Sequence, residues 1–228
     1  MKIGIAIAVA RELKAFLESD YKVEVIKQDN REVYKTIINN NEVYAIKTGF
    51  GKIDAAASTQ YLITKYNVQV ILNFGVTGAL KSELKVEDLF IVDSAINYDY
   101  DVSSVDPVKK YQYEEFDDEH IPLDKGLIKL VKDINPNLKE VVCGSGDSFI
   151  SDMNKKLELA ELGCSLCDME IAAIARVCFI NKVKCLSIKC ISDTLQGDGS
   201  DFEKNVVSAA NKAFKLIQEI LLRIKTVC

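Results

Sequence analysis

The sequence predicts a single α/β domain. Apolar runs of strand length alternate along the chain with segments whose apolar residues recur at helical spacing. The chain has 228 residues, which is enough for one domain with a substantial core, and no Pro/Gly/Ser-rich linker divides it. We therefore predict one domain over residues 1–228.

The first third of the chain predicts a central strand, two helices and an antiparallel meander. Residues 2–9 are apolar nearly throughout, as in a strand that is covered on both faces. The next segment, 11–18, carries an apolar stripe at helical spacing, so Glu12 falls on the first turn of a helix. The runs that follow are separated by Asp and Asn turn residues and predict three strands and then a helix, at 21–28, 32–38, 42–47 and 53–66.

The rest of the chain repeats strand, loop and helix. We predict strands at 68–73, 86–92, 140–143, 164–169 and 184–192. We predict helices at 127–134, 153–162, 171–181 and 201–225. The last helix is entered through an expected capping box of Ser200 and Glu203. Glycine-bearing loops are expected at 74–80 and 144–150, and residues 97–122 form a loop of a length usual for functional lids or disordered segments.

Two carboxylates stand where predicted strands end. Glu170 follows the run 164–169, and Asp193 follows Ser192 at the end of the strand 184–192. If these two strands are neighbours, the carboxylates meet at the edge where α/β sheets bind ligands. The competing interpretation is that they are helix caps, because Asp and Glu after a strand often have that role. The geometry predicted from the residues leaves both interpretations open.

The charge pattern indicates a small substrate. The net charge is -5, and the 29 Lys and Arg residues are spread through the chain, so no basic face for nucleic acid stands out. The charged and apolar N-terminus is short for a signal peptide and leads directly into Arg11, Glu12 and Lys14. We therefore interpret it as the first strand, and we expect a cytoplasmic protein without membrane or nucleic-acid partners.

The residue types also limit the chemistry. The seven cysteines are an odd number, and several fall in predicted strands, which favours reduced core thiols over a disulfide framework. Cys164 and Cys167 form a C-x-x-C but lack the second pair or the histidines of a zinc site, so no metal is predicted. The only histidine, His120, lies in a predicted loop, so acid–base work falls to carboxylates, Lys or Tyr. The Gly-x-Gly at 49–51 has Asp54 where a dinucleotide fingerprint needs glycine, so we expect no NAD.

Five short motifs follow one another in a distinctive order and spacing. They are Gly49-Phe50-Gly51-Lys52, Asn73-Phe74-Gly75-Val76-Thr77-Gly78-Ala79, Ser145-Gly146-Asp147-Ser148-Phe149-Ile150, Met169-Glu170-Ile171-Ala172-Ala173 and Ile191-Ser192-Asp193. With Glu12 at their head, they resemble the nucleoside phosphorylase superfamily over residues 1 to about 222, and most closely its 5′-methylthioadenosine/S-adenosylhomocysteine nucleosidases. The resemblance implies a three-layer α/β/α fold with a mixed central sheet. It also implies hydrolysis of the N-glycosidic bond of a 5′-substituted adenosine without metal or cofactor.

The resemblance assigns the catalytic roles to carboxylates. Asp193 resembles the general acid that protonates N7 of adenine, with Ser192 as its orienting partner, and Glu12 resembles the base that activates water. Glu170 is implied to hydrogen-bond the ribose hydroxyls. These roles suit the reaction, because adenine leaves poorly as an anion and the oxocarbenium ion left behind needs negative charge and a water. Burial together with the carboxylates Glu12 and Glu170 is expected to raise the pKa of Asp193.

The resemblance also assigns residues to substrate binding. By position, Met169 packs beneath the sugar, Phe149 stacks on the base, and Ile150 contacts the adenine edge through its main chain. Phe50 of the first motif is a further candidate for the binding site.

The chain departs from the family at three of its candidate binding positions. Val76 stands where a small polar residue is usual, Lys189 where an arginine is usual, and Val9 where a methionine is usual. The first two positions lie near the water or phosphate pocket, and Thr77 is a possible source of the missing hydroxyl. Val9 helps to shape the pocket for the 5′ group, which the region 97–116 covers in the family.

Two alternatives remain beside the nucleosidase. A phosphorylase of the same fold would need a cluster of cations for phosphate, but the four arginines, Arg11, Arg31, Arg176 and Arg223, lie away from the glycine loops. A nucleoside-binding protein without activity would have lost water activation through Val76 and Lys189. The resemblance further implies a homodimer.

Overall fold

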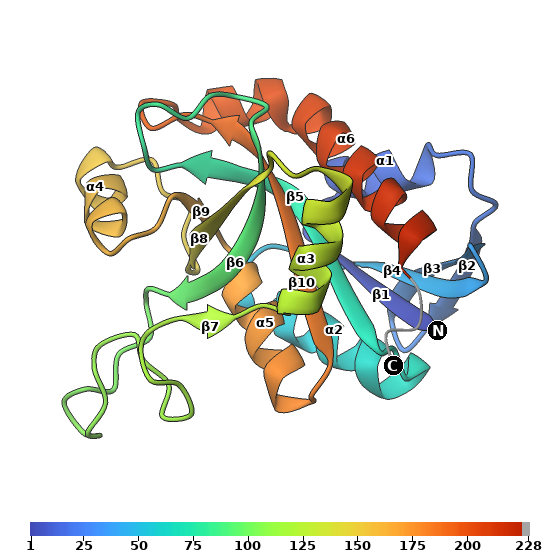
Figure 1. Ribbon diagram of the computed structural model, residues 1–228, viewed down its shortest axis with the longest axis horizontal. Helices are drawn as coiled ribbons and strands as arrows, with labels where there is room; N and C mark the ends of the chain where they lie inside the picture. Colours follow the sequence, from blue (N-terminus) through green and yellow to red (C-terminus); the bar gives the residue numbers. More distant parts are fainter. Residues whose placement is uncertain (225–228) are drawn as a thin grey trace.

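Ten strands form one mixed sheet with helices on both faces in the computed structural model, which describes residues 1–224 (Figure 1). The strands are β1 (Lys2–Ile7), β2 (Glu24–Gln28), β3 (Arg31–Ile38), β4 (Asn41–Lys47), β5 (Val70–Ala79), β6 (Leu89–Asn97), β7 (Ile121–Pro122), β8 (Lys139–Ser145), β9 (Leu166–Asp168) and β10 (Lys184–Asp193). The helices are α1 (Ala10–Leu17), α2 (Lys52–Tyr66), α3 (Lys125–Ile134), α4 (Met153–Glu161), α5 (Ile171–Ile180) and α6 (Gly199–Arg223).

The helices form two layers. Helix α6 packs on β5 and β10 and contacts α1 and α3, whereas α2 and α5 pack together on the opposite face, below the sheet in Figure 1. This arrangement confirms the predicted α/β/α layers around a mixed sheet. No helix within residues 1–224 is long and apolar enough to cross a membrane.

Part of the sheet closes on itself. The strand order is β10-β6-β8-β9-β5-β1-β4-β3-β2, and β10 also pairs with β5, so five strands form a ring from which β1 to β4 extend. The predicted meander of β2, β3 and β4 is confirmed. Strands β1, β4, β5 and β10 are parallel, so their C-terminal ends meet at one edge, where open α/β sheets bind ligands.

Strands β9 and β10 are not neighbours, because the end of β5 lies between them. Gly78 of β5 pairs with Cys167 of β9 on one side and with Asp193 of β10 on the other. Strand β5 continues to Ala79 in place of the loop predicted at 74–80, since partners on both sides satisfy its backbone. The strand ends that carry Glu170 and Asp193 therefore still meet.

The predicted entry of the last helix was also wrong. Asp198 caps α6, with its side chain accepting a hydrogen bond from the backbone N–H of Ser200 at 2.8 Å. Glu203 pairs instead with Arg11 of α1. The expected end of this helix at residue 225 lies outside the described residues.

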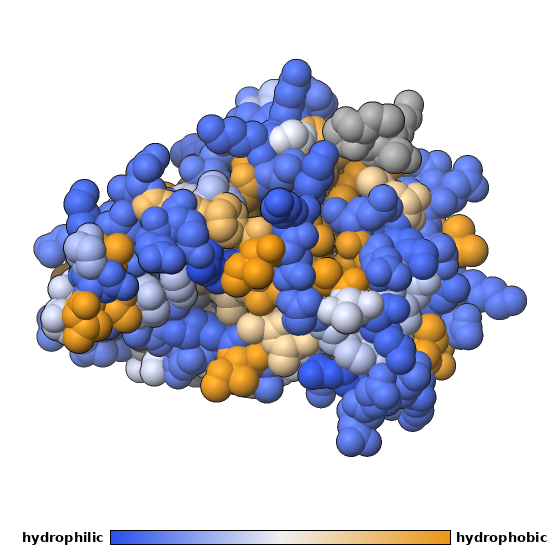
Figure 2. All heavy atoms as spheres, turned by 90° about the horizontal axis from the view of Figure 1, so that it is seen from below, coloured by the Kyte–Doolittle hydropathy of each residue, from blue (hydrophilic) through white to orange (hydrophobic). Residues whose placement is uncertain are grey.

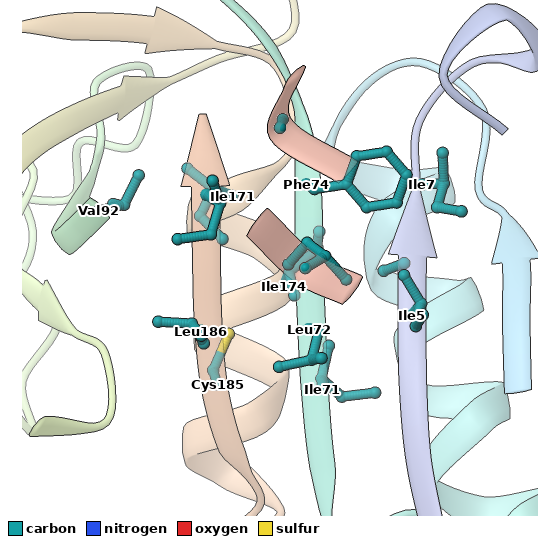
Figure 3. Packing of buried hydrophobic residues seen from close by; sticks show 14 of the residues in the cluster. Ile5, Ile7, Ile71, Leu72, Phe74, Val92, Ile171, Ile174, Cys185 and Leu186 are labelled. Atoms are coloured by element: carbon teal, nitrogen blue, oxygen red, sulfur yellow. The ribbon is translucent and has the colours of Figure 1, made fainter. Parts of the chain in front are cut away.

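The core lies between the sheet and its helices. Figure 3 shows side chains of β1, β5 and β10, among them Ile5, Leu72 and Leu186, packed beside Ile174 of α5. All six cysteines of the described part of the chain are free and buried, which confirms the prediction of core thiols for them; Cys228 lies outside it. In the long segment 97–122, the side chains of Tyr98 and Tyr111 are buried, whereas residues 103–107 are exposed.

Candidate active site

A cavity of about 430 Å³ lies where the parallel strands end. Its size suits a small organic ligand. It is lined by Ala8, Val9, Arg11, Glu12, Phe50, Val76, Thr77, Gly78, Phe149, Cys167, Asp168, Met169, Glu170, Ser192, Asp193, Gly199, Phe202 and Glu203. No group of three His, Cys, Asp or Glu side chains within residues 1–224 is arranged to hold a metal ion.

Glu12 is a buried carboxylate whose two oxygens each accept a hydrogen bond from a backbone N–H. The N–H of Val9 donates to Oε2 at 3.1 Å, and the N–H of Val76 donates to Oε1 at 2.8 Å. Because the second bond comes from the main chain, it does not require a polar side chain at Val76. Burial raises the pKa of Glu12, although the charge of Lys189 and the two N–H donors act in the opposite direction.

Two glycines of β5 make room for carboxylates. A Cβ at Gly75 would collide with Oε1 of Glu12, and a Cβ at Gly78 would lie 2.9 Å from Oδ2 of Asp193. Neither glycine has a positive φ, so space and not backbone conformation explains these residues. The glycines of the second motif are thus a steric condition for the site.

Glu170 immediately precedes α5, but its side chain does not cap that helix. Its Oε1 accepts from the N–H of Gly51 at 3.0 Å, and its Oε2 accepts from the N–H of Met169 at 3.3 Å. Asp168 accepts from the N–H of Ile171 at 3.2 Å, so the side-chain cap of α5 comes from Asp168. Burial first, and then the charge of Asp168, raise the pKa of Glu170 to about 8.

A buried ion pair lies beneath these groups. Nζ of Lys189 is 2.7 Å from Oδ2 of Asp168, and both side chains are 3% exposed. The Ser145 hydroxyl donates to Oδ1 of Asp168 at 2.5 Å and accepts from the N–H of Ala172 at 2.9 Å. Burial acts to lower the pKa of Lys189, but the surrounding carboxylates, with Asp168 first, raise it overall. Lys189 therefore keeps its charge.

Asp193 ends β10 as a buried carboxyl group. The hydroxyl of Ser192 donates to its Oδ1 at 2.8 Å. Burial raises the pKa of Asp193, whereas the Ser192 hydrogen bond and the charge of Lys156 act to lower it.

The carboxylates that help to raise this pKa are not the ones expected from the sequence. The carboxylates that act most strongly on the pKa of Asp193 are Asp201 and Asp198, at the start of α6, and not Glu12 and Glu170. The reason is the turn after β10, which brings the acidic N-terminus of α6 back toward Asp193.

Aromatic and apolar side chains form the cavity walls. The rings of Phe149 and Phe202 lie with their centroids 5.8 Å apart and their planes at 73°. Val9, Phe50 and Met169 line the same cavity. Such a wall suits a flat heteroaromatic ring beside the carboxylates.

The described cavity lining contains one cation, Arg11, and that cation is already paired. Its guanidinium forms two hydrogen bonds with Glu203, and the second, from Nη2 to Oε1, is 2.8 Å long. It also lies 5.2 Å from the ring centroid of Phe202. The pair thereby joins α1 to α6 at the cavity.

Ten of the twelve candidate residues line the cavity: Val9, Glu12, Phe50, Val76, Thr77, Phe149, Met169, Glu170, Ser192 and Asp193. Ile150 packs instead against a small core cluster that contains Tyr98, and Lys189 lies behind the wall. The hydroxyl of Thr77 donates to the Cys167 carbonyl at 2.8 Å.

Four lining residues that matter for the site were not predicted from the sequence: Asp168, Arg11, Phe202 and Glu203. A signal existed for Asp168, which stands directly before Met169 and Glu170. The contacts of the other three depend on how α6 packs on α1, which the local sequence does not encode.

Comparisons with known proteins agree along the whole chain. The profile of the Phosphorylase superfamily matches residues 2–222. The chain is 31% identical to a 5′-methylthioadenosine/S-adenosylhomocysteine nucleosidase of Buchnera aphidicola, with 99% of this chain and 98% of the relative covered. It is 28% identical to an aminodeoxyfutalosine nucleosidase of Campylobacter jejuni, with coverages of 92% and 93%. The crystal structure of a Helicobacter pylori 5′-methylthioadenosine/S-adenosylhomocysteine nucleosidase superposes with a TM-score of 0.92 at 28% identity, covering 98% of this chain and 99% of that one.

Gly75→Ala is expected to lower the free energy of unfolding by roughly 1–3 kcal/mol, because the new methyl group displaces a buried carboxylate from its donors. Chemical denaturation measures this change. Gly199→Ala is the matched control, since a Cβ there meets nothing within 4 Å. Equal effects of the two substitutions would contradict the steric role of Gly75.

Glu170→Gln is expected to change how stability depends on pH. Folding raises the pKa of Glu170 from 4.5 to about 8, so the stabilisation from its bound proton is fully present below the lower value and is lost as pH rises through the upper one. The melting temperature of the wild type should therefore fall relative to that of the variant as pH rises from 4.5 to about 8. Above that range, the difference between the two melting temperatures should stay constant. A constant difference across the range would show that Glu170 is already ionised at the lower pH.

Proposed function

Because the chain belongs to the phosphorylase superfamily, as a member of the 5′-methylthioadenosine/S-adenosylhomocysteine nucleosidase type, we propose that it hydrolyses the N-glycosidic bond of 5′-substituted adenosines and releases adenine. The observation that carries the proposal is the cavity itself. It gathers the buried carboxyl groups of Glu12, Glu170 and Asp193 beside the rings of Phe149 and Phe202.

Asp193 is the proposed general acid. A carboxyl group must hold its proton near neutral pH to donate it, and burial raises the pKa of Asp193 in that direction. The proton passes from Asp193 to N7 of adenine as the bond from C1′ to N9 breaks. The Ser192 hydroxyl, 2.8 Å from Oδ1, orients the group and stabilises the carboxylate that remains.

Glu12 and Glu170 are the proposed partners of the sugar. A water attacks C1′ and loses a proton to Glu12, whose raised pKa suits a base. Glu170 accepts hydrogen bonds from the ribose hydroxyls. The positive charge that develops on the sugar favours the ionised form of both carboxyl groups, because an opposite charge nearby lowers a carboxyl pKa.

The walls of the cavity fit the rest of a nucleoside. We assign Phe149 to stacking on the adenine and Met169 to the underside of the ribose, as their places in the lining allow. The family resemblance assigns the main chain of Ile150 to the adenine edge, while its side chain packs outside the cavity lining. Val9 and Phe50 remain for the 5′ substituent.

The cations of the site favour water over phosphate as the nucleophile. Arg11 is paired with Glu203, and Lys189 is paired with Asp168 behind the wall. Phosphate binding needs a positively charged group that is not already paired.

The proposed function is tested by measuring adenine release from methylthioadenosine with and without phosphate. Release that is independent of phosphate supports the hydrolase, dependence on phosphate supports a phosphorylase, and tight binding without release supports a binding protein.

The identity of the 5′ substituent is a separate proposal. The relatives bear the names of nucleosidases for methylthioadenosine, S-adenosylhomocysteine and aminodeoxyfutalosine, whose 5′ groups differ in size and charge. We propose methylthioadenosine or S-adenosylhomocysteine as substrate. Relative kcat/KM values for the three nucleosides test this assignment.

Asp193→Asn is expected to lower kcat for adenine release by at least about a hundredfold, since general-acid catalysis contributes about 10²–10⁴-fold. Asparagine keeps the shape of the side chain but cannot donate the proton. A 4-nitrophenyl riboside, whose leaving group departs without protonation, should be affected much less. Equal losses on both substrates, or a melting temperature that falls in step with the rate, would remove Asp193 from the role of acid.

We further propose a cytoplasmic homodimer. The free thiols of the six described cysteines favour a reducing compartment.

Exposed apolar side chains near the cavity support the homodimer. Phe50 and Ile53 are 60% and 80% exposed, which is unusual for large apolar side chains at the start of a helix. Figure 2 shows that apolar side chains also gather in patches on the face seen from below. In the segment 97–122, Tyr98 and Tyr111 are buried within the chain, so their rings do not contribute to such a contact.

Sedimentation equilibrium is expected to give twice the chain mass of 25.4 kDa at micromolar concentration. Phe50→Ser combined with Ile53→Ser should shift the distribution toward the single-chain mass, because less apolar surface is buried. A wild-type particle of 25.4 kDa would rule out the dimer.

A further inference from the structure

Lys156 of α4 is a fully buried lysine whose ammonium group donates to three main-chain carbonyls. They belong to Thr194, Leu195 and Gly197, at 3.2, 3.1 and 2.7 Å. The residue has an exposed fraction of 0%. All three donors of the ammonium group are therefore satisfied by one short stretch of chain.

Burying this charge is expensive unless its surroundings compensate for it. Within residues 1–224, no carboxylate lies within ion-pair distance of Lys156, so the compensation comes from carbonyl dipoles. An apolar side chain of similar length would fill the same space without this desolvation cost. The ammonium group is thus best explained by what it does to the stretch 194–197.

That stretch joins the proposed acid to the cavity wall. Asp193 ends β10, residues 194–198 form the turn, and α6 then brings Gly199 and Phe202 to the cavity. Fixing the three carbonyls fixes the direction in which the chain leaves Asp193.

The charge of Lys156 also acts on Asp193. The groups that face this carboxyl are Lys156 from α4, Asp198 and Asp201 from α6, the Ser192 hydroxyl, and the thiol of Cys167 on β9. Lys156 is the cation in this set, and its charge acts against burial and the two aspartates.

We propose that Lys156 is a positioning residue for the Asp193 acid, holding the turn after β10 in place and stabilising the carboxylate that Asp193 becomes when its proton passes to the base. The inference rests on the proposed function. When the proton moves from Oδ of Asp193 to N7 of adenine, the negative charge stays on Asp193. The fixed ammonium group is already placed to stabilise it, without reorganisation during the reaction.

The test uses two substitutions that separate the two effects. Lys156→Gln keeps donors for the carbonyls but removes the charge, and Lys156→Met removes both. Lys155→Met is the matched control, because Lys155 is the neighbouring lysine on α4 and pairs with Glu158 at the surface. Adenine release from methylthioadenosine is measured across pH, together with melting temperature and the rate on a 4-nitrophenyl riboside.

Both Lys156 variants should shift the alkaline limb of kcat/KM to higher pH, because loss of the charge lets the pKa of Asp193 rise further. Lys156→Met should also lower kcat by roughly 10- to 100-fold, as expected when a reacting group is misplaced. Lys156→Gln should lose less kcat, and Lys155→Met should show neither effect. On the aryl riboside, which needs no acid, both Lys156 variants should retain most of their rate.

An alkaline limb that stays in place in a folded Lys156 variant would overturn the proposal. So would equal losses of rate on the nucleoside and on the aryl riboside, since these indicate a structural role alone. If Lys156→Met does not fold, the pH profile of Lys156→Gln decides. Failure of the wild type to release adenine would instead refute the proposed function, and this inference with it.

Discussion

The buried ion pair between Lys189 and Asp168 is the interaction on which the rest of the site depends. Lys189 lies within β10, Asp168 ends β9, and the same carboxylate accepts from Ser145 of β8 and from the first N–H of α5. One carboxylate therefore joins three strands of the ring to a helix. Removing one partner would leave an uncompensated buried charge, which typically costs about 3–5 kcal/mol. Because Asp168 supplies the side-chain cap of α5, the neighbouring Glu170 is free to face the cavity.

The site holds more buried acid than the nearby cations neutralise. Glu12 has two N–H donors, Glu170 has two N–H donors but an anionic neighbour, and Asp193 has a hydroxyl and a more distant ammonium group. Burial raises the pKa of all three carboxyl groups. A cavity of this kind discriminates in favour of a ligand that becomes positively charged. An oxocarbenium-like sugar supplies that charge only as the glycosidic bond breaks, so the attraction is greatest in the transition state.

Much of this arrangement could be predicted from the sequence because it is local. The Glu12 position on a first helical turn follows from spacing along α1, and the placement of Glu170 and Asp193 at strand ends follows from apolar runs. The features that could not be predicted depend on contacts between segments far apart in the sequence. The ring closure that puts β5 between β9 and β10 depends on pairing between distant segments, as does the packing of α6 that brings Asp198 and Asp201 near the acid. The glycines Gly75 and Gly78 led to the wrong prediction of a loop in β5. They instead leave space for the side chains of Glu12 and Asp193.

Two departures from the family pattern, Val76 and Lys189, keep the contacts that the site needs. At Val76, the hydrogen bond to Glu12 comes from the backbone, so valine leaves both donors of that carboxylate in place. At Lys189, a single ammonium group meets one oxygen of Asp168, a contact that needs no planar two-pronged donor. The lysine therefore keeps the positive charge beneath Glu12 and Glu170 while adding no free cation to the cavity lining. Neither departure removes a contact that the proposed water-activating carboxylate makes, and the second leaves phosphate without a partner, so both are compatible with hydrolysis.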